Sequence, residues 1–136
     1  MQLSSRVDIL GIPVHPYPSV DALHHDMHDL ITRRQHALVL NVNAHALNLA
    51  YEQAWLKDML KLAEIVFCDS KGVIFAGRLL GHYIPISIGY GYWIWDLSRF
   101  LEQHGFSIFL LGGKPGIAEA AAARLTARNP ALRIAG

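Results

Sequence analysis

The stretch from Ile65 to Leu80 constrains the fold of this chain more than any other part of the sequence. Its first residues, Ile65–Cys68, are all apolar and are typical of a short buried strand. Asp69 and Ser70 then end the strand with polar side chains. After them, apolar residues recur at helical spacing, at Val73, Ala76, Gly77 and Leu80. The stretch therefore predicts a strand, a polar turn and a helix.

Asp69 is the candidate functional residue of this stretch. A strand that leads directly into a helix places such a carboxylate at the C-terminal edge of a sheet, beside the free N–H groups of the new helix. Open α/β sheets bind their ligands at that edge. An equally good interpretation makes Asp69 a helix N-cap that offsets the helix dipole. The stretch alone leaves both interpretations open.

The strand-then-helix pattern recurs along the chain and sets the expected fold class. We expect a Rossmann-like α/β fold, in which an open, mainly parallel sheet carries helices on both faces. The 136 residues fit a single domain over 1–136. The expected elements are a strand over Val7–Ile12 closed by Pro13, a helix from Val20 to about Arg34 capped by Ser19, a strand over Ala37–Asn43, helices over 44–54 and 55–63, a strand over Phe106–Leu111, a helix over Ile117–Arg128 and a strand beginning at Leu132–Ala135.

Polar features follow three of these strands. Asn41 and Asn43 share a face of an extended strand end and can address one ligand, although turn residues of this type also satisfy nearby backbone. The loop Gly112-Gly113-Lys114-Pro115-Gly116 leads from a strand into a helix, so its N–H groups can approach a phosphate. It matches neither a Walker A loop nor the GxGxxG fingerprint. Together with Asp69, these features predict one site at the carboxyl edge of the sheet.

Two other segments invite a functional reading. His24 and His28 have the spacing of a metal pair, but no Glu lies between them and no third ligand is evident, so we expect His24, His25 and His28 to be solvated. Aromatic residues cluster between His82 and Trp95. Aromatic side chains usually fill a core; the alternative is a platform for a sugar, a base or a lipid tail, where a lipid-linked acceptor or a subunit docks.

Composition excludes several classes of protein. The formal net charge of +1 disfavours nucleic-acid binding. The single cysteine, Cys68, permits no disulfide within the chain and indicates a reducing, cytoplasmic compartment. No apolar run approaches the roughly 18 residues of a membrane-spanning helix, and the first residues lack the apolar stretch of a signal peptide.

The chain contains five characteristic blocks in this order: Ile9–Val14, Asn41–Ala44, Cys68–Val73, Ala76–Gly81 and Phe109–Gly116. Their order and spacing resemble those of the WecG/TagA/CpsF glycosyltransferases of bacterial cell-surface polysaccharide synthesis. The resemblance implies an inverting transfer of an N-acetylmannosamine-type sugar or related hexose from a UDP-sugar to a lipid-diphosphate-linked saccharide at the inner face of the inner membrane. It implies that Asp69 is the general base, that Asn41 and Asn43 lie beside the sugars, and that the Gly112–Gly116 loop, with Lys114, holds the nucleotide end.

The sequence also departs from the family pattern. Cys68-Asp-Ser-Lys-Gly72 stands where Pro-Asp-Gly is usual, position 41 is often Thr, and Ser87–Trp93 lacks an Arg and an Asp of the family block. The resemblance implies further C-terminal strands and a membrane-docking tail that this sequence does not include. An uncovered sheet edge would favour a homo-oligomer.

We expect no cofactor and metal-independent turnover, because no Asp-x-Asp pair is present to bind a metal. The competing function is a non-catalytic, nucleotide-binding Rossmann-like module with NAD as its ligand.

Overall fold

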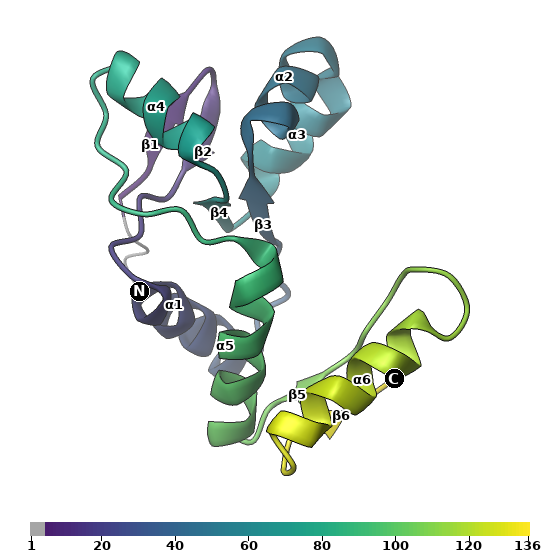
Figure 1. Cartoon of the computed structure of the whole chain (residues 1–136). Coiled ribbons are helices and arrows are strands. Elements are labelled where there is room, and N and C mark those ends of the chain that lie inside the picture. Colours follow the sequence, from purple (N-terminus) through teal and green to yellow (C-terminus); the bar gives the residue numbers. More distant parts are fainter. Residues whose placement is uncertain (1–4) are drawn as a thin grey trace. The chain divides into compact units, whose positions relative to one another are not determined.

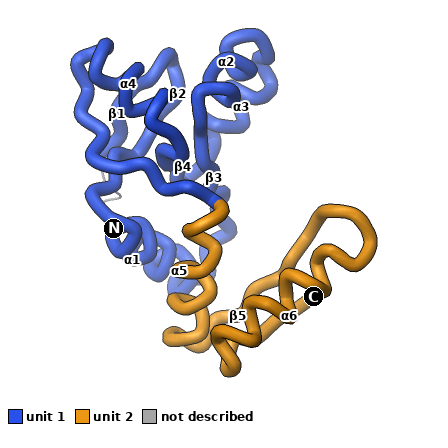
Figure 2. Tube along the Cα trace, viewed as in Figure 1, with its two compact units in different colours: residues 1–90 blue, residues 91–136 orange. Residues whose placement is uncertain are grey.

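The computed structural model describes residues 5–136 as a mixed α/β chain (Figure 1). The chain divides into two compact units, residues 1–90 and residues 91–136 (Figure 2). The first unit contains β1 (Val7–Ile9), β2 (Ile12–Val14), α1 (Val20–Thr32), β3 (Val39–Val42), α2 (Ala44–Glu52), α3 (Ala54–Leu62), β4 (Ile65–Cys68) and α4 (Lys71–Leu79). Helix α5 (Tyr90–Gln103) begins at the boundary, and β5 (Ser107–Ile108), α6 (Ile117–Arg128) and β6 (Arg133–Ile134) complete the second unit.

The first unit begins with a β-hairpin rather than with one strand. β1 and β2 pair antiparallel, joined by Leu10 and Gly11, which have φ values of 56° and 83°. Positive φ at both central residues is the backbone of the tightest hairpin turns. The Gly11 N–H also donates to the Asp8 carboxylate at 2.9 Å. The prediction of one strand closed by Pro13 is therefore wrong, since Pro13 lies inside β2.

The parallel pair β3–β4 lies at the centre of the first unit. The register runs from Val39 opposite Ile65 to Val42 opposite Cys68, and α2 and α3 form the connection. The His15 N–H, just after β2, donates to the Val66 carbonyl at 2.7 Å, which attaches the hairpin to β4. The α/β class is thus confirmed. The strands form short pairs, antiparallel β1–β2 and parallel β3–β4 and β5–β6, without a closed barrel in the described chain.

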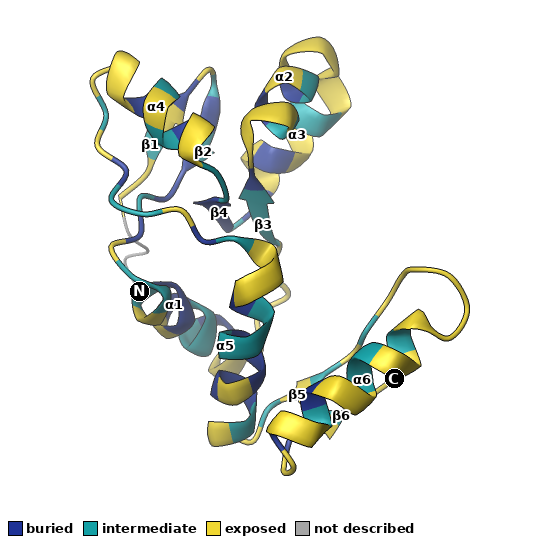
Figure 3. Cartoon of the chain, viewed as in Figure 1, coloured by how far each residue is buried: buried dark blue, intermediate teal, exposed yellow. Residues whose placement is uncertain are grey.

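The hydrophobic core of the first unit surrounds β4, whose four residues are 0–3% exposed. Apolar side chains from both hairpin strands, β3, α2, α3 and α4 pack in the same cluster. Figure 3 shows buried residues on β2 and β4 and a mostly half-buried β3, while the outer faces of α2, α3 and α4 are exposed. A strand buried on both faces fixes where its last residue, and therefore Asp69, can lie.

A polar group is enclosed beside this core. The Tyr17 hydroxyl donates to the Asp26 carboxylate at 2.8 Å, and both residues are buried. The His15 ring stacks on the Tyr17 ring at 5.8 Å between centroids. His24 is also buried, so the expectation of a solvated side chain is wrong for His24, whereas His25 is exposed.

His15 makes the stability of the first unit depend on pH. Burial lowers the pKa of His15 below its ordinary value of 6.5, with the Arg6 guanidinium adding to this and the Val66 carbonyl opposing it. The unfolded chain therefore takes up the proton at higher pH than the folded one. The contribution of His15 to the free energy of unfolding is fully present above about pH 6.5. It decreases as the pH drops below that value, by up to about 1.4 kcal/mol per pH unit.

Urea unfolding between pH 7.5 and pH 5 measures this loss. His15→Gln should flatten the dependence, whatever its effect on absolute stability, while His36→Gln, at an exposed position, should keep the wild-type slope. Equal slopes for all three proteins would contradict the assignment to His15.

The second unit is held together by a polar contact between α5 and the end of α6. The Asn129 amide donates to the Ser98 hydroxyl at 2.9 Å, and both side chains are buried. The predicted strand Phe106–Leu111 is shorter, Ser107–Ile108, and pairs parallel with β6. Beyond the pair, the Leu110 N–H donates to the Gly136 carbonyl at 2.8 Å, which extends the ladder.

Three of the five aromatic side chains between His82 and Trp95 are exposed. Trp93 is buried at 4% exposure, but Tyr83, Tyr90 and Tyr92 are 71%, 53% and 86% exposed. The expectation of buried aromatic side chains therefore holds for Trp93 and is wrong for the three tyrosines. Their spacing gave no consistent helical stripe that would have separated inward from outward positions.

Candidate functional site

Asp69 immediately follows β4 and is half-buried. Its N–H donates to the Val42 carbonyl at 2.9 Å, so the parallel pairing continues one residue beyond the strand and fixes the Asp69 backbone. Its carboxylate accepts a hydrogen bond from the Asn41 amide at 2.5 Å, between Nδ2 and Oδ2. An ionised carboxylate can only accept hydrogen bonds, so the NH₂ group of Asn41 must be the one that faces it.

Ser70, rather than Asp69, caps helix α4. The Ser70 backbone is extended, and its hydroxyl accepts from the Val73 N–H at 3.4 Å. The interpretation of Asp69 as the N-cap is therefore wrong. The carboxylate is instead directed to the neighbouring strand, as expected of a residue at a ligand-binding edge.

Asn41 and Asn43 have different hydrogen bonds. Asn41 lies opposite Phe67 in the register, and side chains two positions apart on a strand share a face, so Asn41 and Asp69 meet. Asn43 lies where the chain turns into α2, and its side chain accepts from the Ala46 N–H at 2.8 Å. Asn43 thus caps α2, as the turn interpretation expected, while Asn41 contacts the candidate base.

Two helices begin next to Asp69. A Cβ atom added at Gly72, in the first turn of α4, would lie 3.1 Å from the Ala44 Cβ, in the first turn of α2. The first turns of the two helices are therefore in close contact at the carboxyl edge of β3 and β4. Each helix N-terminus carries roughly half a positive charge and N–H groups without partners inside the helix. This edge consequently favours a ligand with oxygen acceptors.

Cys68 is not suited to nucleophilic chemistry. Burial raises the pKa of its thiol, and its Sγ contacts the Ser70 carbonyl at 3.3 Å. A thiol held in its neutral form is a weak nucleophile. Cys68 therefore serves the packing of β4.

The Gly112–Gly116 loop belongs to the second unit and is exposed along its length. Gly112, Gly113 and Gly116 have φ values of 121°, 81° and 87°, which side chains other than glycine rarely allow. Gly116 precedes α6 without any side-chain cap. A glycine backbone that opens onto a helix N-terminus suits close contact with a phosphate, and Lys114 adds a cation within the loop.

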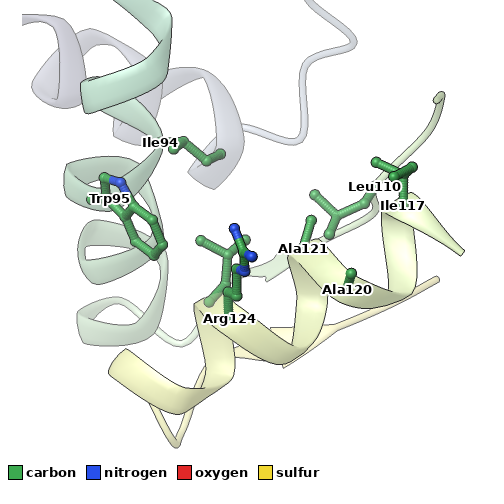
Figure 4. A pocket seen from close by; sticks show the side chains of 8 residues that line it. Ile94, Trp95, Leu110, Ile117, Ala120, Ala121 and Arg124 are labelled. Atoms are coloured by element: carbon green, nitrogen blue, oxygen red, sulfur yellow. The ribbon is translucent and has the colours of Figure 1, made fainter.

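Sequence reasoning missed an apolar pocket in the second unit (Figure 4). Its volume is about 330 Å³. The lining residues come from α5, α6 and the segment after β5: Ile94, Trp95, Leu110, Ile117, Ala120, Ala121, Arg124 and Leu125. The Gly112–Gly116 loop connects two of them, Leu110 and Ile117. The signal in the sequence was the pair of alanines, which leave space on one face of α6.

Comparison with known proteins gives the family. The family model described as "Glycosyl transferase WecG/TagA/CpsF family" matches residues 7–136 of the 136-residue chain. The chain belongs to the WecG/TagA/CpsF glycosyltransferase family. This confirms the resemblance that the sequence blocks indicated. No individual curated protein matches the chain.

Membership in the WecG/TagA/CpsF family gives the protein its reaction class, the transfer of a sugar from a donor to an acceptor. Over residues 5–136, no three His, Cys, Asp or Glu side chains are grouped so that they could hold a metal ion. In the same range, no helix combines the length and apolar character needed to cross a bilayer.

Proposed function

We propose that this chain is an inverting glycosyltransferase that moves an N-acetylmannosamine-type sugar or related hexose from a UDP-sugar to a lipid-diphosphate-linked saccharide. The observation that carries the proposal is the position of Asp69, at the carboxyl end of β4, with its carboxylate held by Asn41. The family match supplies the reaction class, and the donor and acceptor classes follow from the resemblance.

Asp69 acts as the general base in this proposal. The acceptor hydroxyl gives its proton to the Asp69 carboxylate while its oxygen attacks the anomeric carbon of the donor. The bond from that carbon to the diphosphate breaks, and UDP leaves with the electron pair. Asn41 holds Oδ2 through its amide, so Oδ1 is the oxygen that receives the proton. Proton transfer by a positioned side chain contributes typically 10²–10⁴-fold to a rate.

We propose that the Gly112–Gly116 loop binds the diphosphate. N–H groups of the Gly112–Gly116 loop and the Lys114 ammonium meet the phosphate oxygens and stabilise the charge that develops on the leaving group. Asn43 contributes to the site by fixing the backbone where β3 ends and α2 begins, because its side chain caps α2. The reaction occurs at the inner face of the bacterial inner membrane, where the lipid-linked acceptor lies.

The competing function, a non-catalytic nucleotide-binding module, predicts a different ligand. The two proposals separate in a calorimetric titration of the purified chain with UDP and, in parallel, with NAD, each with and without EDTA in the buffer. We expect UDP to bind, NAD not to bind, and EDTA to leave UDP affinity unchanged. Lys114→Ala should weaken UDP binding, while Lys61→Ala, at another exposed lysine, should not.

The titration can overturn the proposal in several ways. Binding of NAD alone would favour the module without catalysis. Loss of UDP binding in EDTA, restored by added manganese, would refute metal-independent binding of the nucleotide. Binding of neither ligand would show that the Gly112–Gly116 loop does not hold a nucleotide in this chain.

A further inference from the structure

Helix α4 presents an exposed apolar face that the packing of the first unit leaves uncovered. Val73 and Gly77 face inward, and the inner face contacts Ile84 and β1. On the outer side, Phe75 is 62% and Leu79 is 73% exposed. We call the exposed set the α4 face; it comprises Lys71, Phe75, Arg78, Leu79, Leu80 and Tyr83.

The spacing of the α4 face makes it continuous. Lys71, Phe75, Arg78 and Leu79 follow the i, i+4, i+7, i+8 pattern of one side of a helix. Leu80 and Tyr83 extend the apolar surface beyond the C-terminus of α4. Figure 3 shows this helix with exposed residues along its length. Exposed apolar groups gathered in this way, unlike single ones, mark an interaction surface.

The charge of the α4 face has one sign. Lys71 and Arg78 are exposed on it, and no Asp or Glu occurs from Ser70 to Tyr90. The nearby hairpin contains Asp8, whose carboxylate is directed to its own turn by the Gly11 N–H. The α4 face is therefore apolar and cationic together, which is the composition of helices that lie on anionic membranes.

A second exposed apolar set in the same unit provides a contrast. Tyr51, Trp55 and Leu62, on α2 and α3, are also exposed. Exposed charges of both signs lie among them, at Glu52, Asp58 and Lys61. An anionic surface would gain little net attraction there, so apolar exposure alone does not distinguish the α4 face, whereas its uniformly positive charge does.

We propose that the α4 face docks on the surface of an anionic lipid bilayer. Phe75, Leu79 and Tyr83 enter the region between headgroups and acyl chains, while Lys71 and Arg78 contact the lipid phosphates. A second copy of the chain is a poorer partner. A two-fold pairing through this face would bring the same cations together, and the face has no carboxylate to pair with them.

This inference rests on the exposure and charge of α4 and is separate from the transfer reaction. It adds a consequence for the proposed site, because α4 begins two residues after Asp69. A membrane contact along α4 would keep the first unit at the surface that holds a lipid-linked acceptor.

Co-sedimentation of the full chain with vesicles tests the proposal. We expect binding to vesicles of phosphatidylcholine that contain roughly 30% of the anionic lipid phosphatidylglycerol, and little binding to vesicles of phosphatidylcholine alone. Raising NaCl from roughly 0.05 M to 0.5 M should weaken binding at least about tenfold, because surface charges are screened.

Matched variants locate the surface. Lys71→Glu with Arg78→Glu, and separately Phe75→Ser with Leu79→Ser, should each reduce vesicle partitioning at least about tenfold. The control pairs, Arg33→Glu with Lys61→Glu and Tyr51→Ser with Leu62→Ser, make the same kinds of change at exposed residues outside the α4 face. They should leave partitioning within about twofold of the parent protein. Circular dichroism confirms that each variant is folded, and UDP titration shows that the nucleotide site is unaffected.

Several results would overturn the proposal. These are absence of binding to anionic vesicles, equal binding to neutral ones, or equal losses in the control pairs. A concentration-dependent dimer that disappears in the α4 variants, without vesicle binding, would assign the face to contact between copies. Absence of UDP binding by the parent protein would count against the proposed function and would not affect the proposal that the α4 face docks on a membrane.

Discussion

An Asp69→Asn variant should lose at least about a hundredfold in transfer rate and keep its affinity for UDP within about threefold. The amide has nearly the shape of the carboxylate, and its oxygen can still accept the hydrogen bond from Asn41. What it lacks is the ability to take a proton. The measurement is release of UDP from a UDP-hexosamine in the presence of a short-chain lipid-diphosphate-linked saccharide, with UDP affinity determined by calorimetry.

Asp58→Asn is the matched control, since it makes the same chemical change at an exposed position on α3. It should turn over at the parent rate. The pH–rate profile adds a second readout, because the limb that reports the base should disappear in the residual activity of Asp69→Asn. A variant with parent activity would refute the role of Asp69 as base, whereas a variant that also loses UDP would indicate a binding role.

A Phe67→Ala variant should lower the free energy of unfolding by about 3–5 kcal/mol. Phe67 is 1% exposed and lies in β4, two residues before Asp69. Removing the ring leaves a cavity next to the hydrophobic core. This loss is a large fraction of the roughly 5–15 kcal/mol that stabilises an ordinary domain. Urea unfolding followed by circular dichroism measures it.

Phe75→Ala provides the same truncation at an exposed position of α4. Its free energy of unfolding should stay within about 0.5 kcal/mol of the parent value. Equal losses for the two variants would mean that β4 does not lie at the centre of the core. A Phe67→Ala protein that folds with a small loss would show that the cavity collapses readily.

The sequence alone was sufficient to predict the central strand β4 and the helix α4 that follows it. Ile65–Cys68 form the buried strand that their apolar run predicted, and the helix follows with Ser70 as its cap. The choice between Ser70 and Asp69 could not be made from the sequence, because both residues are good N-caps. The Asp69 side chain is instead bound by Asn41, which is distant from it in the sequence but adjacent to it in the sheet.

Other features depended on contacts that no local pattern records. Leu10 adopts a positive φ that leucine rarely takes, so the hairpin turn was not visible in the composition. His24 is buried although its neighbour His25 is exposed, and only the packing around α1 separates them. Asn41 and Asn43 are the same residue type and lie two positions apart, but they make different hydrogen bonds because the strand ends between them.

The hairpin has a consequence for synthesis on the ribosome. β1 and β2 are adjacent in sequence and can pair as soon as they emerge, but the strand that they join is distant: the contact between His15 and Val66 spans 51 residues. At translation rates of about 5–20 residues per second, the hairpin waits roughly 3–10 s for its partner. During that interval its unpaired edge is open to other nascent chains. A chaperone that shields short apolar edges early in translation would therefore improve the yield of this protein more than one that acts on the finished chain.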